Sequence, residues 1–147
     1  MTVRPFMAIL PQQTQVGDEI VLKGRIKNDA QIFSVNLTLD CCPNPLNIAY
    51  QFKTNFVEKS VSQNYKKVGI WNEGTEDELS WIQGPGQEFI ITFHFDDNEL
   101  LIYSEDENRN FLYKFDYNFD IGDIKAVQIW DDLDYVTEVI YRYKPNQ

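Results

Sequence analysis

The sequence predicts an all-β protein, built as an antiparallel sandwich or barrel. Runs of alternating apolar and polar residues follow one another along almost the whole chain, and a period of two is typical of half-buried strands. Aromatic residues make up 14% of the chain, which favours strands over helices. No segment of the sequence combines a helical period with capping residues. Many short strands separated by polar turns indicate a sandwich or a barrel.

In the first half of the chain, five segments show strand character. The segment 19–26 follows a turn-like Gly17-Asp18 pair, and 32–39 alternates strictly. We therefore expect strands at 19–26, 32–39, 47–56, 60–65 and 67–71.

In the second half, a hairpin is the clearest feature. The strands expected at 88–95 and 99–104 flank the turn-forming sequence Asp-Asp-Asn. The segment 110–119 follows, and strict alternation would place its aromatic residues on one face. These are Phe111, Tyr113, Phe115, Tyr117 and Phe119. Strands at 126–130 and 136–143 complete the expected set.

Length and charge limit the classes of function. A chain of 147 residues suits one domain, residues 1–147, and 43% hydrophobic residues suffice for a substantial core. With 23 acidic and 13 basic residues, the formal net charge is −10. Such a field repels phosphate backbones and anionic lipids, so neither nucleic acid nor a membrane is an expected partner. No apolar run is long enough to span a bilayer, and we expect no membrane insertion.

The strand expected at 47–56 has two contrasting faces. One face is a core face, formed by Ile48, Tyr50, Phe52, Thr54 and Phe56. The other face carries a row of long polar side chains. A solvated sheet face would explain such a row on its own. The row consists of Gln51, Lys53 and Asn55.

Two later residues favour a sugar site beside this row. Asn64 lies on the next expected strand, and Trp71 lies at the end of the one after. Amide and ammonium groups bind sugar hydroxyls, and an aromatic face packs against the apolar face of a pyranose. A core position for Trp71 is the alternative.

Several motifs resemble those of the galectin family. The strand NIAYQF followed by KTNF resembles the family's N-I-A-x-H-F-N-P-R-F, and VGDEIVLKGRI and AQIFSVNL resemble its opening strands. Asn64 and Trp71 have the spacing of the family's signature Asn and Trp. GQEFIITF and VQIWDDLDYVTEV resemble its later strands, so that the likeness runs from about Val16 to Tyr141. The resemblance implies a jelly-roll sandwich of two antiparallel sheets, with a β-galactoside bound on one concave sheet.

The resemblance also implies which residues form the site, and several of them differ from the family's residues at the same positions. Asn64 and Trp71 match the family, whereas Gln51 stands at its His, Lys53 at its Asn and Asn55 at its Arg. With a two-residue insertion, the segment TEDE places Glu76 at the family's Glu and Glu78 at its second Arg.

These departures lead to two expectations for function. The first is a non-catalytic galectin-like lectin with altered or weakened β-galactoside specificity, which binds glycans or glycoproteins without a cofactor. The alternative is a galectin fold that has lost sugar binding and acts as a protein-interaction or structural module, and pairing of two copies through a sheet edge stays open. A glycoside hydrolase would need two carboxylates about 5–10 Å apart. The acids lie mainly in expected loops, among them Glu73, Glu76, Asp77 and Glu78.

Other candidate residues favour no further activity. His94 is expected to be a structural histidine, because no nucleophile or triad accompanies it. Asp131, Asp132 and Asp134 suggest Ca²⁺ but lack an EF-hand loop. The two cysteines are adjacent, at positions 41 and 42, and are expected to be reduced. With no signal peptide read at the N-terminus, we expect a cytoplasmic or non-classically secreted protein.

Overall fold

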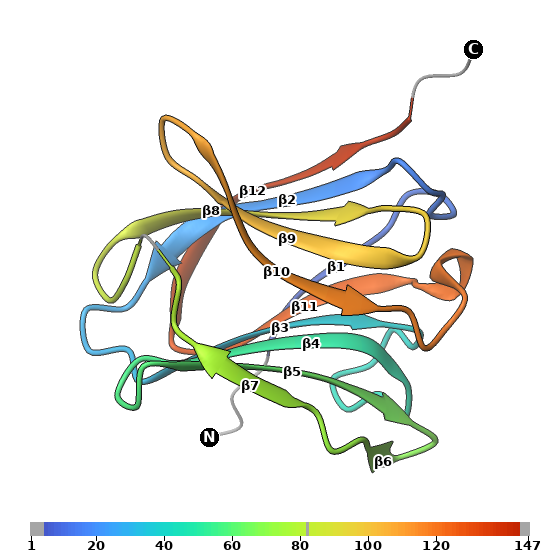
Figure 1. Cartoon of the computed structure of the whole chain (residues 1–147), viewed down its shortest axis with the longest axis horizontal. Helices are drawn as coiled ribbons and strands as arrows, with labels where there is room; N and C mark the ends of the chain where they lie inside the picture. The colour runs from blue at the N-terminus through green and yellow to red at the C-terminus, as the bar shows by residue number, and fades with distance from the viewer. Residues whose placement is uncertain (1–4, 82, 145–147) are drawn as a thin grey trace.

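The structure is a sandwich of two antiparallel sheets. It is a computed structural model that describes residues 5–81 and 83–144. In Figure 1 the five-stranded sheet lies above the seven-stranded sheet, and we call these sheet B and sheet A. Within the described residues the one helical piece is a 3₁₀ turn, Ile121–Asp123, and no helix is long and apolar enough to cross a membrane. The predicted all-β class is therefore confirmed.

Sheet A has the strand order β1-β11-β3-β4-β5-β6, and β7 also pairs with β5. Its members are β1 (Phe6–Ile9), β3 (Ile32–Thr38), β4 (Ile48–Asn55), β5 (Ser60–Lys67), β6 (Ile70–Trp71), β7 (Thr75–Glu78) and β11 (Ala126–Asp131). Sheet B has the order β10-β9-β8-β2-β12. Its members are β2 (Glu19–Ile26), β8 (Glu88–Phe95), β9 (Glu99–Glu105), β10 (Arg109–Asp116) and β12 (Leu133–Arg142).

The core lies between the two sheets and is rich in aromatic rings. Alternate residues of a strand point to one face, so each strand contributes every second side chain. Phe33 and Phe89 meet edge to face, with ring centroids 5.0 Å apart, and Phe52 contacts Phe93 in the same manner at 6.4 Å. Burial of such rings, at roughly 150–250 Å² each, supplies much of the driving force for folding.

Two bulges change the faces that strict alternation predicts. Thr38 pairs with Ile48, whereas the preceding Leu37 pairs with Tyr50, so Ala49 is an extra residue in β4. As a result Ala49 packs against the core, and Ile48 turns to the outer face of sheet A. The expectation of Ile48 on the core face is wrong for this reason.

The second bulge lies in β10, between Phe111 and Tyr113. Tyr113 is buried, whereas Phe111 turns to the outer face of sheet B and meets Tyr103 edge to face at 5.7 Å. The expectation that five aromatic residues share one face is therefore wrong at Phe111.

Two further segments differ from expectation. The expected strand 67–71 contains a two-residue turn, because Val68 and Gly69 both have positive φ (49° and 80°), as a tight hairpin requires. The expected acidic loop is the edge strand β7, which pairs with β5. Charged side chains on an edge strand disfavour pairing with another chain, which gives its acidic sequence a structural reason.

Candidate functional site

The predicted polar row lies on the outer face of sheet A, the face turned away from sheet B. Gln51 of β4 is paired with Asn36 of β3 on one side and with Asn64 of β5 on the other. Asn36 is paired in turn with Gln128 of β11. Four amide residues thus form one row across four strands. Lys53 lies in the neighbouring row, between Ser34 and Ser62.

Two of the predicted amides are already engaged by the backbone. The Asn55 side chain accepts hydrogen bonds from the backbone N–H groups of Val57 (3.1 Å) and Glu58 (3.0 Å), and so caps the turn after β4. The Asn64 side chain donates to the Asn72 carbonyl (2.8 Å) and accepts from the Tyr65 N–H (2.8 Å). Asn55 therefore stabilises a turn and Asn64 holds the connection between β6 and β7, and neither side chain has its full hydrogen-bonding capacity free for a ligand.

Trp71 is not a core residue. It lies in β6, paired with Lys66 of β5, and 40% of its surface is exposed. The Lys66 ammonium lies 5.6 Å from the centroid of the indole ring, within the range of a cation–π contact. The indole is accessible, but in this state a lysine side chain lies over it.

The two predicted acidic residues lie at the edge of the same sheet. Glu76 is paired with Ser62 and Glu78 with Ser60, which places both on the outer face by register. Both are exposed. Whether either side chain contacts a sugar stays a prediction.

A pocket of about 230 Å³ forms where the segment 39–47, between β3 and β4, folds over the outer face. We call it the loop-covered pocket. The Gln128 side chain donates to the Cys42 carbonyl (2.6 Å), which ties the segment to the sheet. The pocket is lined by Ser34, Asn36, Pro43, Asn44, Pro45, Ile48, Gln51, Lys53, Lys66, Trp71, Gln128, Trp130 and Asp131.

The wall of this pocket contains a buried acceptor atom without a donor. The Gln128 Oε1 atom accepts from the Asn36 amide (3.4 Å) and from the Trp130 indole N–H (3.1 Å). Asn36 itself is only 4% exposed, and its Oδ1 atom has no hydrogen-bond partner among the described residues. A buried acceptor without a donor costs free energy.

Sequence reasoning missed Asn36, Gln128 and Trp130. Asn36 and Gln128 occupy the polar positions of strands that alternate as any half-solvated strand does. The one available signal was that polar residues occur at matching positions in several expected strands, and this acquires meaning only when strand pairing is known.

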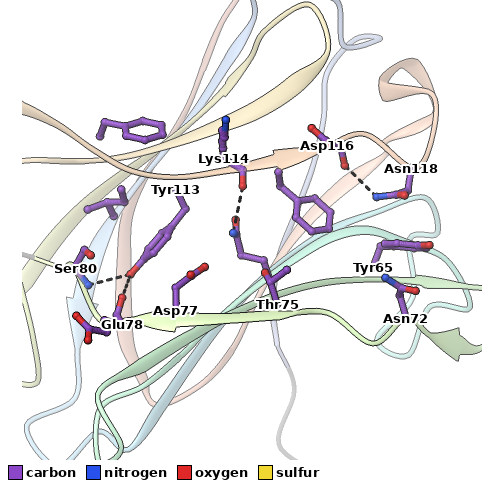
Figure 2. Close-up of a pocket in the computed structure, with 14 residues that line it drawn as sticks. Tyr65, Asn72, Thr75, Asp77, Glu78, Ser80, Tyr113, Lys114, Asp116 and Asn118 are labelled. Carbon is purple, nitrogen blue, oxygen red and sulfur yellow. Dashed lines mark hydrogen bonds between the residues drawn. The ribbon is translucent and has the colours of Figure 1, made fainter.

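A second and larger cavity, of about 840 Å³, lies at the open side of the sandwich, between β7 of sheet A and β10 of sheet B (Figure 2). We call it the inter-sheet groove. The Tyr113 hydroxyl donates to the Glu78 carbonyl (2.6 Å) and accepts from the Ser80 N–H (2.9 Å). The Gln63 side chain donates to the Lys114 carbonyl (3.3 Å). Polar atoms in this groove therefore connect the two sheets. Figure 2 also shows Asp77 pointing from β7 into the groove.

The remaining candidates have structural roles. His94 Nδ1 lies 2.8 Å from Glu19 Oε2, and Glu19 also pairs with Arg109 and Arg142. Burial raises the pKa of Glu19, but Arg109 and His94 outweigh it, and the net pKa lies below its ordinary value. This cluster agrees with the prediction of a structural histidine.

The acidic residues after β11 also serve the fold. Asp132 accepts from the N–H groups of Gln31 and Ile32, and Asp134 pairs with Arg25 at 3.2 Å. Across residues 5–81 and 83–144, no group of three His, Cys, Asp or Glu side chains is arranged to hold a metal ion.

Comparisons with known proteins agree with this architecture. A family model described as galactoside-binding lectin matches residues 5–141. The structure is similar to that of sheep galectin-11 in complex with glycerol, with a TM-score of 0.78 and 17% identity over 96% of this chain and 99% of that chain. It is also similar to a variant of human galectin-16, with a TM-score of 0.78 and 20% identity over 97% of this chain and 96% of that chain. A search of curated protein sequences gave no match.

Proposed function

The chain belongs to the galactoside-binding lectins, the galectins, and on that premise we propose that it binds glycans in the loop-covered pocket with altered β-galactoside specificity. Members of this family are lectins, so the domain is a non-catalytic, galectin-like carbohydrate-binding domain. Its fold is the jelly-roll sandwich that the sequence resemblance implied.

The observation that carries the proposal is that one pocket is lined both by Asn36, whose Oδ1 atom has no hydrogen-bond partner among the described residues, and by the exposed indole of Trp71. A pyranose presents hydroxyl donors on its rim and an apolar C–H face. All three residues line the same pocket: Gln51 supplies an amide, Trp71 supplies an aromatic face, and Asn36 carries an acceptor oxygen that is buried in the unliganded state. This combination matches the two kinds of surface that a sugar ring carries.

Altered specificity follows from the residues at the family's recognition positions. Gln51 and Asn55 stand where the resemblance places His and Arg, and the Asn55 amide oxygen is used within its own turn. Loss of one hydrogen bond to a charged group costs about 1.5–3 kcal/mol, and each 1.4 kcal/mol is tenfold in affinity. We therefore expect lactose to bind weakly or below detection.

A second candidate is the galectin fold used for protein interaction or as a structural module. Two observations favour it: the Asn64 amide is engaged at both its atoms, and Lys66 lies over Trp71. In that case Asn64 and Trp71 are not available to a sugar.

A glycan panel on the full chain separates the two candidates. We expect at least one member other than lactose to bind, and we expect Trp71→Ala to reduce that binding by tenfold or more. Phe111→Ala is the matched control, because Phe111 is an exposed aromatic residue on the opposite sheet. If no member of a broad panel binds the unmodified chain, the lectin proposal is wrong and the interaction-module reading replaces it.

A further inference from the structure

Two lysines and one acidic residue line the loop-covered pocket, so its charged side chains carry a net positive charge. Lys53 and Lys66 both line it. Lys53 lies two residues after Gln51 in β4, and Lys66 lies two residues after Asn64 in β5. Because β4 and β5 are antiparallel, the two lysines lie on opposite sides of the Gln51–Asn64 pair. Two residues of strand span about 7 Å, so a lysine side chain on either side reaches a ligand centred on that pair.

Neither lysine is neutralised within the described part of the chain. The ion pairs between described residues involve other basic side chains, and among residues 5–81 and 83–144 no carboxylate lies within 4.0 Å of the Lys53 or Lys66 ammonium. Asp131 is the one acidic residue that lines the pocket, and its carboxylate accepts a hydrogen bond from the Ser34 hydroxyl (3.0 Å). Glu76 lies on the same face, two strands from Lys53.

On these observations we propose that the preferred ligand of the loop-covered pocket is an anionic glycan, whose sulfate or carboxylate group is held by Lys53 and Lys66. This inference rests on the proposed lectin function and adds the chemical class of the ligand. In a chain with a net charge of −10, the pocket places two lysines and one acidic residue, Asp131, in its lining, together with the buried Asn36 Oδ1 atom.

The position of Lys66 supplies a reason for selectivity. Its ammonium lies over the face of Trp71, which is the surface a sugar ring would use. A neutral sugar that displaces the ammonium offers it only uncharged hydroxyl acceptors. A sulfate or carboxylate offers a stronger partner, because an ion pair with direct hydrogen bonds exceeds an exposed cation–π contact. When Lys66 pairs with the anion, its ammonium moves off the Trp71 indole, and the sugar ring can then pack against that face.

Asn36 should allow the pocket to discriminate between a charged glycan and a simple anion. Its free Oδ1 atom accepts hydrogen bonds, so it repels an anionic oxygen and favours a hydroxyl donor. The ligand must therefore carry its negative charge toward the lysines and a hydroxyl toward Asn36. A charged sugar meets both conditions, and inorganic sulfate meets only the first.

The test compares matched ligands on the full chain. Titration calorimetry would use a neutral galactoside disaccharide, its sulfated derivative, its sialylated derivative and sodium sulfate. We expect one of the two charged glycans to bind at least tenfold more tightly than the neutral parent, and to weaken as ionic strength rises. The sulfated and sialylated arms show which anion is used.

Charge-matched variants locate the effect. Lys53→Gln and Lys66→Gln should each reduce the preference for the charged glycan by about fivefold or more. Lys66→Gln should also raise affinity for the neutral parent, because no ammonium then lies over the Trp71 ring. Lys67→Gln is the control: it removes the same charge from the adjacent residue, whose ammonium lies 5.4 Å from the Phe119 ring centroid.

Each result that differs from these expectations would overturn one specific part of the proposal. Equal affinity for neutral and charged glycans, still dependent on Trp71, rejects the anionic class and leaves the lectin proposal standing. An equal loss in Lys67→Gln rejects a role for the two pocket lysines. Competition by sodium sulfate at the same concentration as the charged glycan rejects the glycan as the ligand. If none of the four ligands binds in the titrations and no member of the broad glycan panel binds, the lectin function itself is rejected.

Discussion

The loop-covered pocket and the inter-sheet groove differ in what their polar atoms do. The groove is the larger cavity, at about 840 Å³ against about 230 Å³. Its polar side chains connect the two sheets, as Tyr113 does through Glu78 and Ser80. In the pocket, by contrast, the Asn36 Oδ1 atom has no partner among the described residues. The larger cavity therefore has polar side chains that stabilise the fold, whereas the smaller one contains a buried acceptor that the fold leaves unused.

If the two regions differ in this way, the same substitution on two neighbouring strands should reduce stability in one case and glycan binding in the other. Gln63 is buried, accepts from the Tyr50 hydroxyl (2.6 Å) and donates to the Lys114 carbonyl. Gln63→Leu leaves both partners unsatisfied, and we expect a loss of about 2–4 kcal/mol in the free energy of unfolding. Urea unfolding followed by circular dichroism would measure it.

Gln51→Leu is the matched control for Gln63→Leu. Gln51 lies on the outer face and lines the loop-covered pocket. Its substitution should change stability by less than about 1 kcal/mol and weaken glycan binding. A stable Gln63→Leu variant, or an unstable Gln51→Leu variant, would contradict the division of roles between the two regions.

The Tyr50 hydroxyl, which donates to the groove residue Gln63, should also make the stability of the protein fall at alkaline pH. Burial, with a smaller contribution from Tyr113, raises the pKa of the Tyr50 hydroxyl well above its ordinary value of 10.0. The folded state then holds the proton more tightly than the unfolded state, so this stabilisation is complete below pH 10 and is lost as pH rises toward the folded pKa. We expect the free energy of unfolding to fall above pH 10 by up to about 1.4 kcal/mol per pH unit for this group.

Denaturant midpoints measured between pH 7 and pH 11 would test this dependence. Tyr50→Phe is the control variant, since it removes the titrating group and should flatten the alkaline limb. An unchanged slope in Tyr50→Phe would show that other tyrosines dominate.

The fold was predictable where a strand alternates apolar and polar residues without a bulge. The strand 19–26 matches β2 residue for residue, and the Asp-Asp-Asn turn falls between β8 and β9 as expected. The bulges at Ala49 and between Phe111 and Tyr113 were not predictable, because one extra residue reverses all later faces and leaves no local mark in a single sequence.

The site was only partly predictable, for a related reason. Gln51, Lys53 and Trp71 followed from alternation and from the galectin resemblance, and they line the pocket. The engagement of Asn64 depends on the path of the connection 72–74, where Gly74 has a φ of 75° and an added Cβ would lie 3.0 Å from the Asn64 Cγ atom. Such engagement arises from backbone placement, which strand patterns do not contain.

The smallest expected effect concerns the edge of sheet A. Glu76 is exposed on β7, outside the residues that line the loop-covered pocket. Glu76→Gln should leave stability unchanged and raise affinity for a charged glycan about twofold, because a distant like charge is largely screened. Calorimetry at low salt would detect this change. A tenfold loss of affinity would instead show that Glu76 contacts the sugar directly, as the family resemblance implies.

The central claim is that glycans bind on the outer face of sheet A and not in the inter-sheet groove. The most direct test is an NMR titration of the labelled chain with the tightest-binding glycan of the panel, following the side-chain N–H signals. We predict the largest shifts at the Trp71 indole and at the Asn36, Gln51 and Gln128 amides, with the Gln63, Asn72 and Asn118 amides unchanged. Shifts confined to Gln63, Asn72 and Asn118, which line the groove, would contradict the claim.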